Sequence, residues 1–192
     1  LAMFRAPIVY ILSHMHEDHL KGLNGGIGVG DFSPNVHWNF GPIYCSAATH
    51  RMMLLRFPHL EPFLLPCKSQ EWIEICTLPP QMVPADCQNS KVKIRLIDAN
   101  HCPGAVMIHI SGPLGEILHT GDFRYRSQPM LKEIGDHQFD FLYMDNTFST
   151  PNEDFPPQPV AYQKLLAKIK EVRAADEKAK CYIYCYTLGK EE

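Results

Sequence analysis

The chain has 192 residues, of which 45% are hydrophobic, and a formal net charge of −3 from 18 basic and 21 acidic side chains. This size and composition predict one globular domain, or one domain and the beginning of another. The charge balance excludes an overall positive field that would attract nucleic acid, and no apolar run approaches the roughly 18 residues of a membrane span.

Short β-rich apolar runs separated by turns follow one another along the chain. We expect strands at residues 8–12, 42–45, 92–97, 105–110, 116–119, 139–144 and 181–186. A helix is predicted over residues 47–56 after the N-cap candidate Ser46, and another over 159–174. Segments rich in glycine or proline predict loops at residues 24–41, 79–90 and 151–159. This order indicates a mixed α/β fold with antiparallel strands in its middle.

The seven cysteines form an odd set without a Cys-x-x-Cys pair. This usage is typical of reduced thiols inside a cell, and it argues against a disulfide framework. The sequence begins at Leu1, which is not a usual start, and it ends where a strand gives way to what resembles a helix start. We therefore expect it to be a piece of a longer protein.

A dense group of potential metal ligands directly follows the first predicted strand, in Ser13-His14-Met15-His16-Glu17-Asp18-His19. Alternate residues of an extended segment point the same way, so His14 and His16 can reach one metal ion. As the chain turns, Asp18 and His19 can face a second ion. Imidazole and carboxylate ligands suit zinc, with manganese or iron as alternatives. A polar surface turn is the simpler interpretation, but it leaves this density of ligands unexplained.

Two sites cannot be completed by four neighbouring residues, so further ligands should follow later strands. His101 lies in Asn100-His101-Cys102-Pro103-Gly104 after the strand at 92–97, and Asp122 lies in Thr120-Gly121-Asp122-Phe123-Arg124 after the strand at 116–119. Glycine or proline lets each turn bend and aim its side chain. Taken alone, His101 could equally be a hydrogen-bonded core histidine. Together with the first motif, both residues become ligand candidates.

The order His-x-His-x-Asp-His, then a lone histidine, then Gly-Asp, resembles the metallo-β-lactamase superfamily. The residues of the motifs are similar to those of the β-CASP DNA-repair nucleases of the Artemis and Apollo group, and most similar to the Apollo pattern. The resemblance runs from Ile8 to Glu191. It rests on Leu12-Ser13-His14-Met15-His16-Glu17-Asp18-His19, Asp98-Ala99-Asn100-His101-Cys102-Pro103-Gly104, Thr120-Gly121-Asp122-Phe123-Arg124-Tyr125, Tyr143-Met144-Asp145-Asn146-Thr147 and Tyr186-Thr187-Leu188-Gly189-Lys190-Glu191.

The resemblance implies a truncated metallo-β-lactamase αββα sandwich. A catalytic domain lacking its N-terminal strands would cover residues 1–180, and a β-CASP region would begin within 181–192. It implies two zinc ions, with manganese or magnesium as alternatives. The first ion would be held by His14, His16, His101 and Asp122, and the second by Asp18, His19 and the bridging Asp122.

The resemblance also assigns roles around the metals. Asp18, His19, Asp122 and Asp145 would be catalytic, and Asp145, Gly189 and Lys190 would contact substrate. A turn-capping aspartate is the alternative for Asp145, and an ordinary exposed lysine is the alternative for Lys190. Two cations about 3.5–4 Å apart would activate a bridging water as hydroxide for attack on a phosphodiester.

The implied activity is a 5′-to-3′ exonuclease acting on DNA with 5′-phosphorylated ends. Its implied setting is the nucleus, in the repair of interstrand crosslinks or double-strand breaks or in telomere maintenance, with repair or telomere proteins bound through other regions and no membrane partner. Two other functions remain open. One is a small-molecule hydrolase such as a lactamase or thioesterase, and the other is a non-catalytic scaffold that binds DNA or protein.

Overall fold

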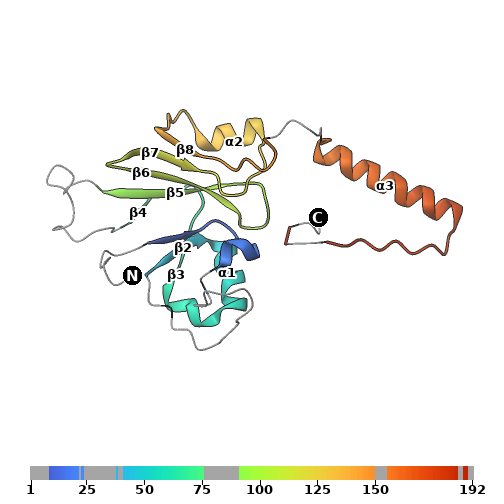
Figure 1. Ribbon diagram of the computed structural model, residues 1–192, viewed down its shortest axis with the longest axis horizontal. Helices are drawn as coiled ribbons and strands as arrows, with labels where there is room; N and C mark the ends of the chain where they lie inside the picture. Colours follow the sequence, from blue (N-terminus) through green and yellow to red (C-terminus); the bar gives the residue numbers. More distant parts are fainter. Residues whose placement is uncertain are drawn as a thin grey trace. The chain divides into compact units, whose positions relative to one another are not determined.

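The computed structural model describes residues 9–21, 23, 38, 41–75, 91–149, 155–185 and 188–189. They fall into two compact units (Figure 1). The first comprises Leu1–Asp145 together with Thr187–Glu192, and the second comprises Asn146–Tyr186. The predicted domain boundary between residues 180 and 181, where the catalytic domain would end and the β-CASP region begin, stays a prediction.

A three-stranded parallel sheet opens the first unit, in the order β1 (Tyr10–Leu12), β2 (Ile43–Ser46) and β3 (Leu64–Cys67). Helix α1 (Ala47–Arg56) and the 3-10 helix η2 (Pro58–Phe63) connect β2 to β3. The Ser46 hydroxyl caps α1 by accepting a hydrogen bond from the Thr49 amide at 3.1 Å. The helix predicted over residues 47–56 is therefore confirmed, with its cap.

A five-stranded sheet follows, in the order β4-β5-β6-β7-β8. Its strands are β4 (Ile73–Ile75), β5 (Val92–Asp98), β6 (Val106–Gly112), β7 (Gly115–His119) and β8 (Phe141–Tyr143). Strands β4 to β7 pair antiparallel, and β8 pairs parallel to β7. The antiparallel strands expected in the middle of the chain are thus confirmed.

Both faces of the five-stranded sheet pack against other parts of the unit. Side chains alternate along its central strands, so neighbouring residues contribute to different cores. Leu96 and Ile108 face a core that includes residues of the three-stranded sheet, such as Cys67. Ile97 and Met107 face the opposite way and pack with Met130 of helix α2 (Ser127–Ile134). Burial on both faces explains why apolar residues follow one another at Leu96-Ile97 in β5 and at Val106–Ile108 in β6.

A third core lies on the outer face of the small sheet, where Ile43 packs with Met53 of α1 and Leu60 of η2. The layers of this unit are therefore helix, sheet, sheet and helix, with α1 and α2 on opposite outer faces (Figure 1). The predicted mixed α/β class is confirmed.

Some elements were not expected from the sequence. Strand β3 contains Pro66, which an edge strand tolerates because its unpaired side needs no amide donor. Helix α2 contains Pro129 in its first turn, where the amide would be unpaired in any case. The strand expected at residues 181–186 is wrong over 181–185, which are exposed and in neither sheet. A strand needs a partner backbone, and β propensity alone does not supply one.

The second unit contains helix α3 (Gln158–Ala175), which confirms the helix predicted over residues 159–174. None of its residues is buried, and Leu165 and Leu166 are 47% and 55% exposed. Among the helices of the described residues, none has both the length and the apolar character that crossing a bilayer requires. The buried residues Cys45 and Cys67 are free thiols.

A buried histidine on the outer side of the five-stranded sheet has both ring nitrogens paired. The Nδ1 atom of His109 lies 3.1 Å from Nη2 of Arg95, and Nε2 lies 2.5 Å from Oε2 of Glu116. A guanidinium only donates, so Nδ1 accepts and Nε2 donates to the carboxylate. Burial is the main cause that lowers the pKa of His109 below 6.5, and the Arg95 charge lowers it further.

This arrangement predicts acid sensitivity of the first unit. The unfolded chain takes up a proton at His109 near pH 6.5, whereas the folded chain does so only at lower pH, so stability falls as the pH falls below 6.5. We expect urea unfolding between pH 7.5 and pH 5.5 to show a fall of up to about 1 kcal/mol from this residue. The fall should be smaller in His109→Gln, and an identical pH dependence in both proteins would refute the assignment.

Candidate metal centre

Three strand ends bring the predicted ligands to one edge of the molecule. His14 to His19 follow β1, the His101 turn follows β5, and the Asp122 turn follows β7. The amide of Val106 donates to the carbonyl of Ser13 at 3.0 Å, which ties the end of β1 to the start of β6. This backbone bond joins the two sheets beside the ligands.

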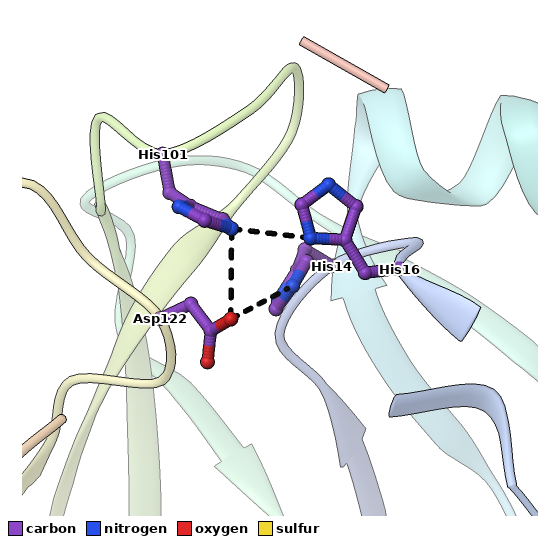
Figure 2. A group of neighbouring side chains, drawn as sticks. All are labelled: His14, His16, His101 and Asp122. Atoms are coloured by element: carbon purple, nitrogen blue, oxygen red, sulfur yellow. Dashed lines mark hydrogen bonds and ion pairs between the residues drawn. The ribbon is translucent and has the colours of Figure 1, made fainter. Parts of the chain in front are cut away.

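Four side chains from these three segments converge (Figure 2). Nε2 of His101 lies 3.2 Å from Nδ1 of His16 and 3.6 Å from Oδ2 of Asp122. The same Oδ2 lies 3.7 Å from Nε2 of His14. One ligand atom from each of the four residues lies within 4.8 Å of the others. The structure thus brings together the four residues that the family resemblance assigns to the first ion.

The electrostatics of His14 fit a metal ligand. Its side chain is fully buried, and burial is the main cause that lowers its pKa to about 3, with further lowering from His19, His16 and His101. The imidazole is therefore neutral at physiological pH, as a metal ligand must be. Its Nε2 atom is buried without a hydrogen-bond partner. A buried unpaired nitrogen is costly, and a cation at this position would satisfy it.

A second group shares one residue with the first. Nε2 of His19 lies 3.3 Å from Oδ1 of Asp122 and 3.5 Å from Oδ2 of Asp18. The carboxylate of Asp122 thus turns Oδ2 toward the first group and Oδ1 toward the second. A carboxylate whose two oxygens face different groups of ligands can bridge two cations.

The segment that carries Asp18 and His19 is bonded to helix α1. Asp18 and His19 lie in the 3-10 helix η1 (Glu17–Leu20). The carboxylate of Glu17 accepts two hydrogen bonds from the guanidinium of Arg56 at the end of α1, one of them at 2.9 Å. This bidentate pair links the start of η1 to the end of α1, next to the two ligands that follow.

The turn that carries His101 is anchored on helix α1. The carbonyl of Gly104 accepts hydrogen bonds from the hydroxyls of Ser46 at 2.7 Å and Thr49 at 3.1 Å. Gly104 has φ +80, and a Cβ there would lie 2.9 Å from the Thr49 amide nitrogen. Only glycine fits this conformation and this contact. The sequence showed the glycine, but it did not show the two hydroxyls that hold it.

The turn that carries Asp122 is shaped by His119 and Thr120. The Gly121 amide donates to Nδ1 of His119 at 3.0 Å, so this histidine supports the turn. The Thr120 hydroxyl accepts from the amide of Asp145 at 3.0 Å, which places that backbone beside the turn. In the described part of the chain, Asp145 is in neither group of converging ligand atoms. Its predicted roles in catalysis and substrate binding stay predictions.

Of the two substrate contacts predicted at the end of the chain, the structure describes Gly189. Gly189 lies against the His101 turn, since a Cβ on it would come within 2.6 Å of Cβ of Cys102. Lys190 lies outside the described residues. The side chain of Cys102 packs beside a core cluster of the large sheet.

Another group of possible ligands, formed by His109, Glu116 and His137, fits a metal poorly. His109 already donates to Glu116 and accepts from Arg95. A cation on Nε2 would require the proton on Nδ1, where it would point at the guanidinium. Both ring nitrogens of His109 are therefore already paired, in contrast to Nε2 of His14, which has no hydrogen-bond partner.

Several known proteins resemble this chain in sequence. No family model matches the chain. The chain is 33% identical over 187 residues to 5′ exonuclease Apollo of Danio rerio, and 32% identical over 184 residues to human DNA cross-link repair 1A protein. The chain is a homologue of the Apollo and cross-link repair proteins. It is also 30% identical over 187 residues to DNA cross-link repair protein SNM1 of Arabidopsis thaliana.

Each alignment with these Apollo and cross-link repair relatives covers 95% of this chain. It covers 28%, 15% and 33% of the respective relative, so the chain spans a third or less of each. The resemblance to the Artemis and Apollo group that the motifs indicated is confirmed. A solved structure of a protein of unknown function from Enterococcus faecalis matches with a TM-score of 0.49 and 17% sequence identity. The match covers 87% of this chain and 39% of that protein's chain, and it is too distant to bear on function.

The contact between Ser13 and His14 generates a prediction. The Oγ atom of Ser13 lies 3.0 Å from Nδ1 of His14, and a proton held there leaves the Nε2 lone pair for a metal. We expect Ser13→Ala to weaken zinc binding about 10–100-fold, measured by competition with a chromophoric chelator. The matched change Ser127→Ala, at the exposed start of α2, should leave the affinity unchanged. Equal affinities in all three proteins would contradict the proposed support.

Proposed function

We propose that this chain carries the metal centre of a DNA nuclease that hydrolyses phosphodiester bonds. The observation that carries the proposal is the carboxylate of Asp122, whose two oxygens face two separate groups of ligands. Homology to proteins named 5′ exonuclease Apollo and DNA cross-link repair protein supports DNA as the substrate. The fold that these motifs and relatives support is the metallo-β-lactamase αββα sandwich.

Two zinc ions fit the donor set of imidazoles and carboxylates, with manganese or magnesium as alternatives. His14, His16, His101 and Asp122 would hold the first ion, and Asp18 and His19, with Asp122 shared, would hold the second. When bound, such ions lower the pKa of water for attack on phosphorus and offset the negative charge that develops on the phosphoryl oxygens.

The residues of the chain contribute charge and position. The chain is net negative, so an approaching phosphate meets attraction only where the local charge is positive. Neutral imidazoles such as that of His14 supply ligands without adding negative charge. Asp18 is 67% exposed, so this side of the group is open to solvent and to a substrate. The centre would therefore be the local attraction that the overall charge does not provide.

Two further contacts belong to the proposal. Asp145 would orient the substrate, because its backbone is held next to the Asp122 turn by Thr120. Gly189 and Lys190 would present a backbone amide and an ammonium group to a phosphate. In the same proposal the enzyme is a 5′-to-3′ exonuclease on DNA with 5′-phosphorylated ends. It would act in the nucleus, in crosslink or double-strand-break repair or in telomere maintenance.

Nuclease assays on the intact protein test this function. We expect mononucleotides to be released from the 5′ end of single-stranded DNA, with 5′-phosphate preferred over 5′-hydroxyl. Chelation should abolish the activity, and zinc should restore it. Asp122→Asn should lower the rate by at least about 10²–10³-fold, because one carboxylate serves both groups. Asp136→Asn, an exposed carboxylate after α2, should not.

Other outcomes would point to other functions. Cleavage of an ester or a lactam with no action on DNA would indicate a small-molecule hydrolase. DNA binding without turnover, unaffected by Asp122→Asn, would indicate a scaffold. Either result would replace the nuclease proposal.

A further inference from the structure

A backbone carbonyl remote in sequence contacts one of the candidate ligands. Nε2 of His16 lies 3.0 Å from the carbonyl oxygen of Leu188, which is 172 positions away. Residues 187–192 belong to the same compact unit as the two sheets, although the segment before them does not. The chain therefore returns to the metal centre with this short segment.

This contact determines which nitrogen of His16 can act as a ligand. A carbonyl oxygen only accepts, so Nε2 of the neutral ring must carry the hydrogen. The lone pair is then on Nδ1, which is the atom that faces Nε2 of His101 at 3.2 Å (Figure 2). In the opposite tautomer the hydrogen would be on Nδ1 and would point into the group of metal ligands. Nε2 and the Leu188 carbonyl oxygen would then be two acceptors that face each other without a hydrogen between them.

A glycine allows the carbonyl to come so close. Gly189 has φ +85, and a Cβ on it would lie 2.6 Å from Cβ and 2.9 Å from Cα of Cys102, and 2.9 Å from Cδ of Pro103. Cys102 directly follows His101, so the same two residues touch both His16 and the turn that carries His101. Two ligands that come from different sheets are thus held by one short segment.

We propose that Leu188 and Gly189 position the first metal site, the Leu188 carbonyl by fixing His16 as an Nδ1 ligand and Gly189 by allowing the close approach to the His101 turn. This inference rests on the proposed function, because it assumes that the ligand group binds a metal. It gives the Leu-Gly segment a role at the metal ligands, in addition to the phosphate contact proposed for Gly189 and Lys190.

The test compares two glycines that both have positive φ. Gly135 has φ +73, and a Cβ there would meet only Cδ2 of His137, at 3.7 Å. Gly189→Ala and Gly135→Ala therefore impose a similar backbone strain, but only the first displaces a segment at the centre. In the intact protein we expect Gly189→Ala to weaken zinc binding about 10–100-fold and Gly135→Ala to leave it unchanged.

A second measurement does not depend on the variant folding. In wild-type protein labelled with ¹⁵N-histidine and loaded with zinc, NMR should show His16 with its hydrogen on Nε2 and the metal on Nδ1. The opposite tautomer, or equal zinc affinities of the two glycine variants, would overturn the role of Leu188 and Gly189 while zinc binding and nuclease activity survive. A wild-type protein that binds no zinc would overturn the proposed function as well.

Discussion

The close approach of several imidazoles and one carboxylate around the buried His14 is the constraint on which the rest of the structure depends. His14 is fully buried with an unpaired Nε2, and its burial together with three neighbouring histidines holds its pKa near 3. Such a group is unfavourable unless the surrounding structure holds it in place. Two hydrophobic sheets supply that rigidity, and each carries its ligands at the ends of its strands.

The local part of this design could be predicted from the sequence. Alternation in an extended segment placed His14 and His16 on one side, and Ser46 marked the beginning of α1. The central strands β5, β6 and β7 were found within two residues of their ends, because their apolar patterns are strong. These features depend on neighbouring residues, and neighbours are visible in a sequence.

What could not be predicted depends on contacts between distant residues. The hydroxyls that hold Gly104, the imidazole that supports the Gly121 turn and the carbonyl beside His16 all come from other parts of the chain or of the fold. The strand expected at residues 181–185 failed for the same reason, since pairing rather than propensity makes a strand. Similarly, His109 and His14 are both buried, and only their partners show that one is satisfied and the other is not.

The separation of the ligands along the chain also affects how the protein folds. His14 and Asp122 come together only when β5, β6 and β7 are paired and the end of β1 is bonded to the start of β6. Closing a loop of this length costs conformational entropy before any contact forms. A nascent chain can offer a cation only the neighbouring candidates His14, His16, Asp18 and His19. Complete coordination therefore arises late in folding, and the cation would stabilise the finished tertiary structure rather than guide its early steps.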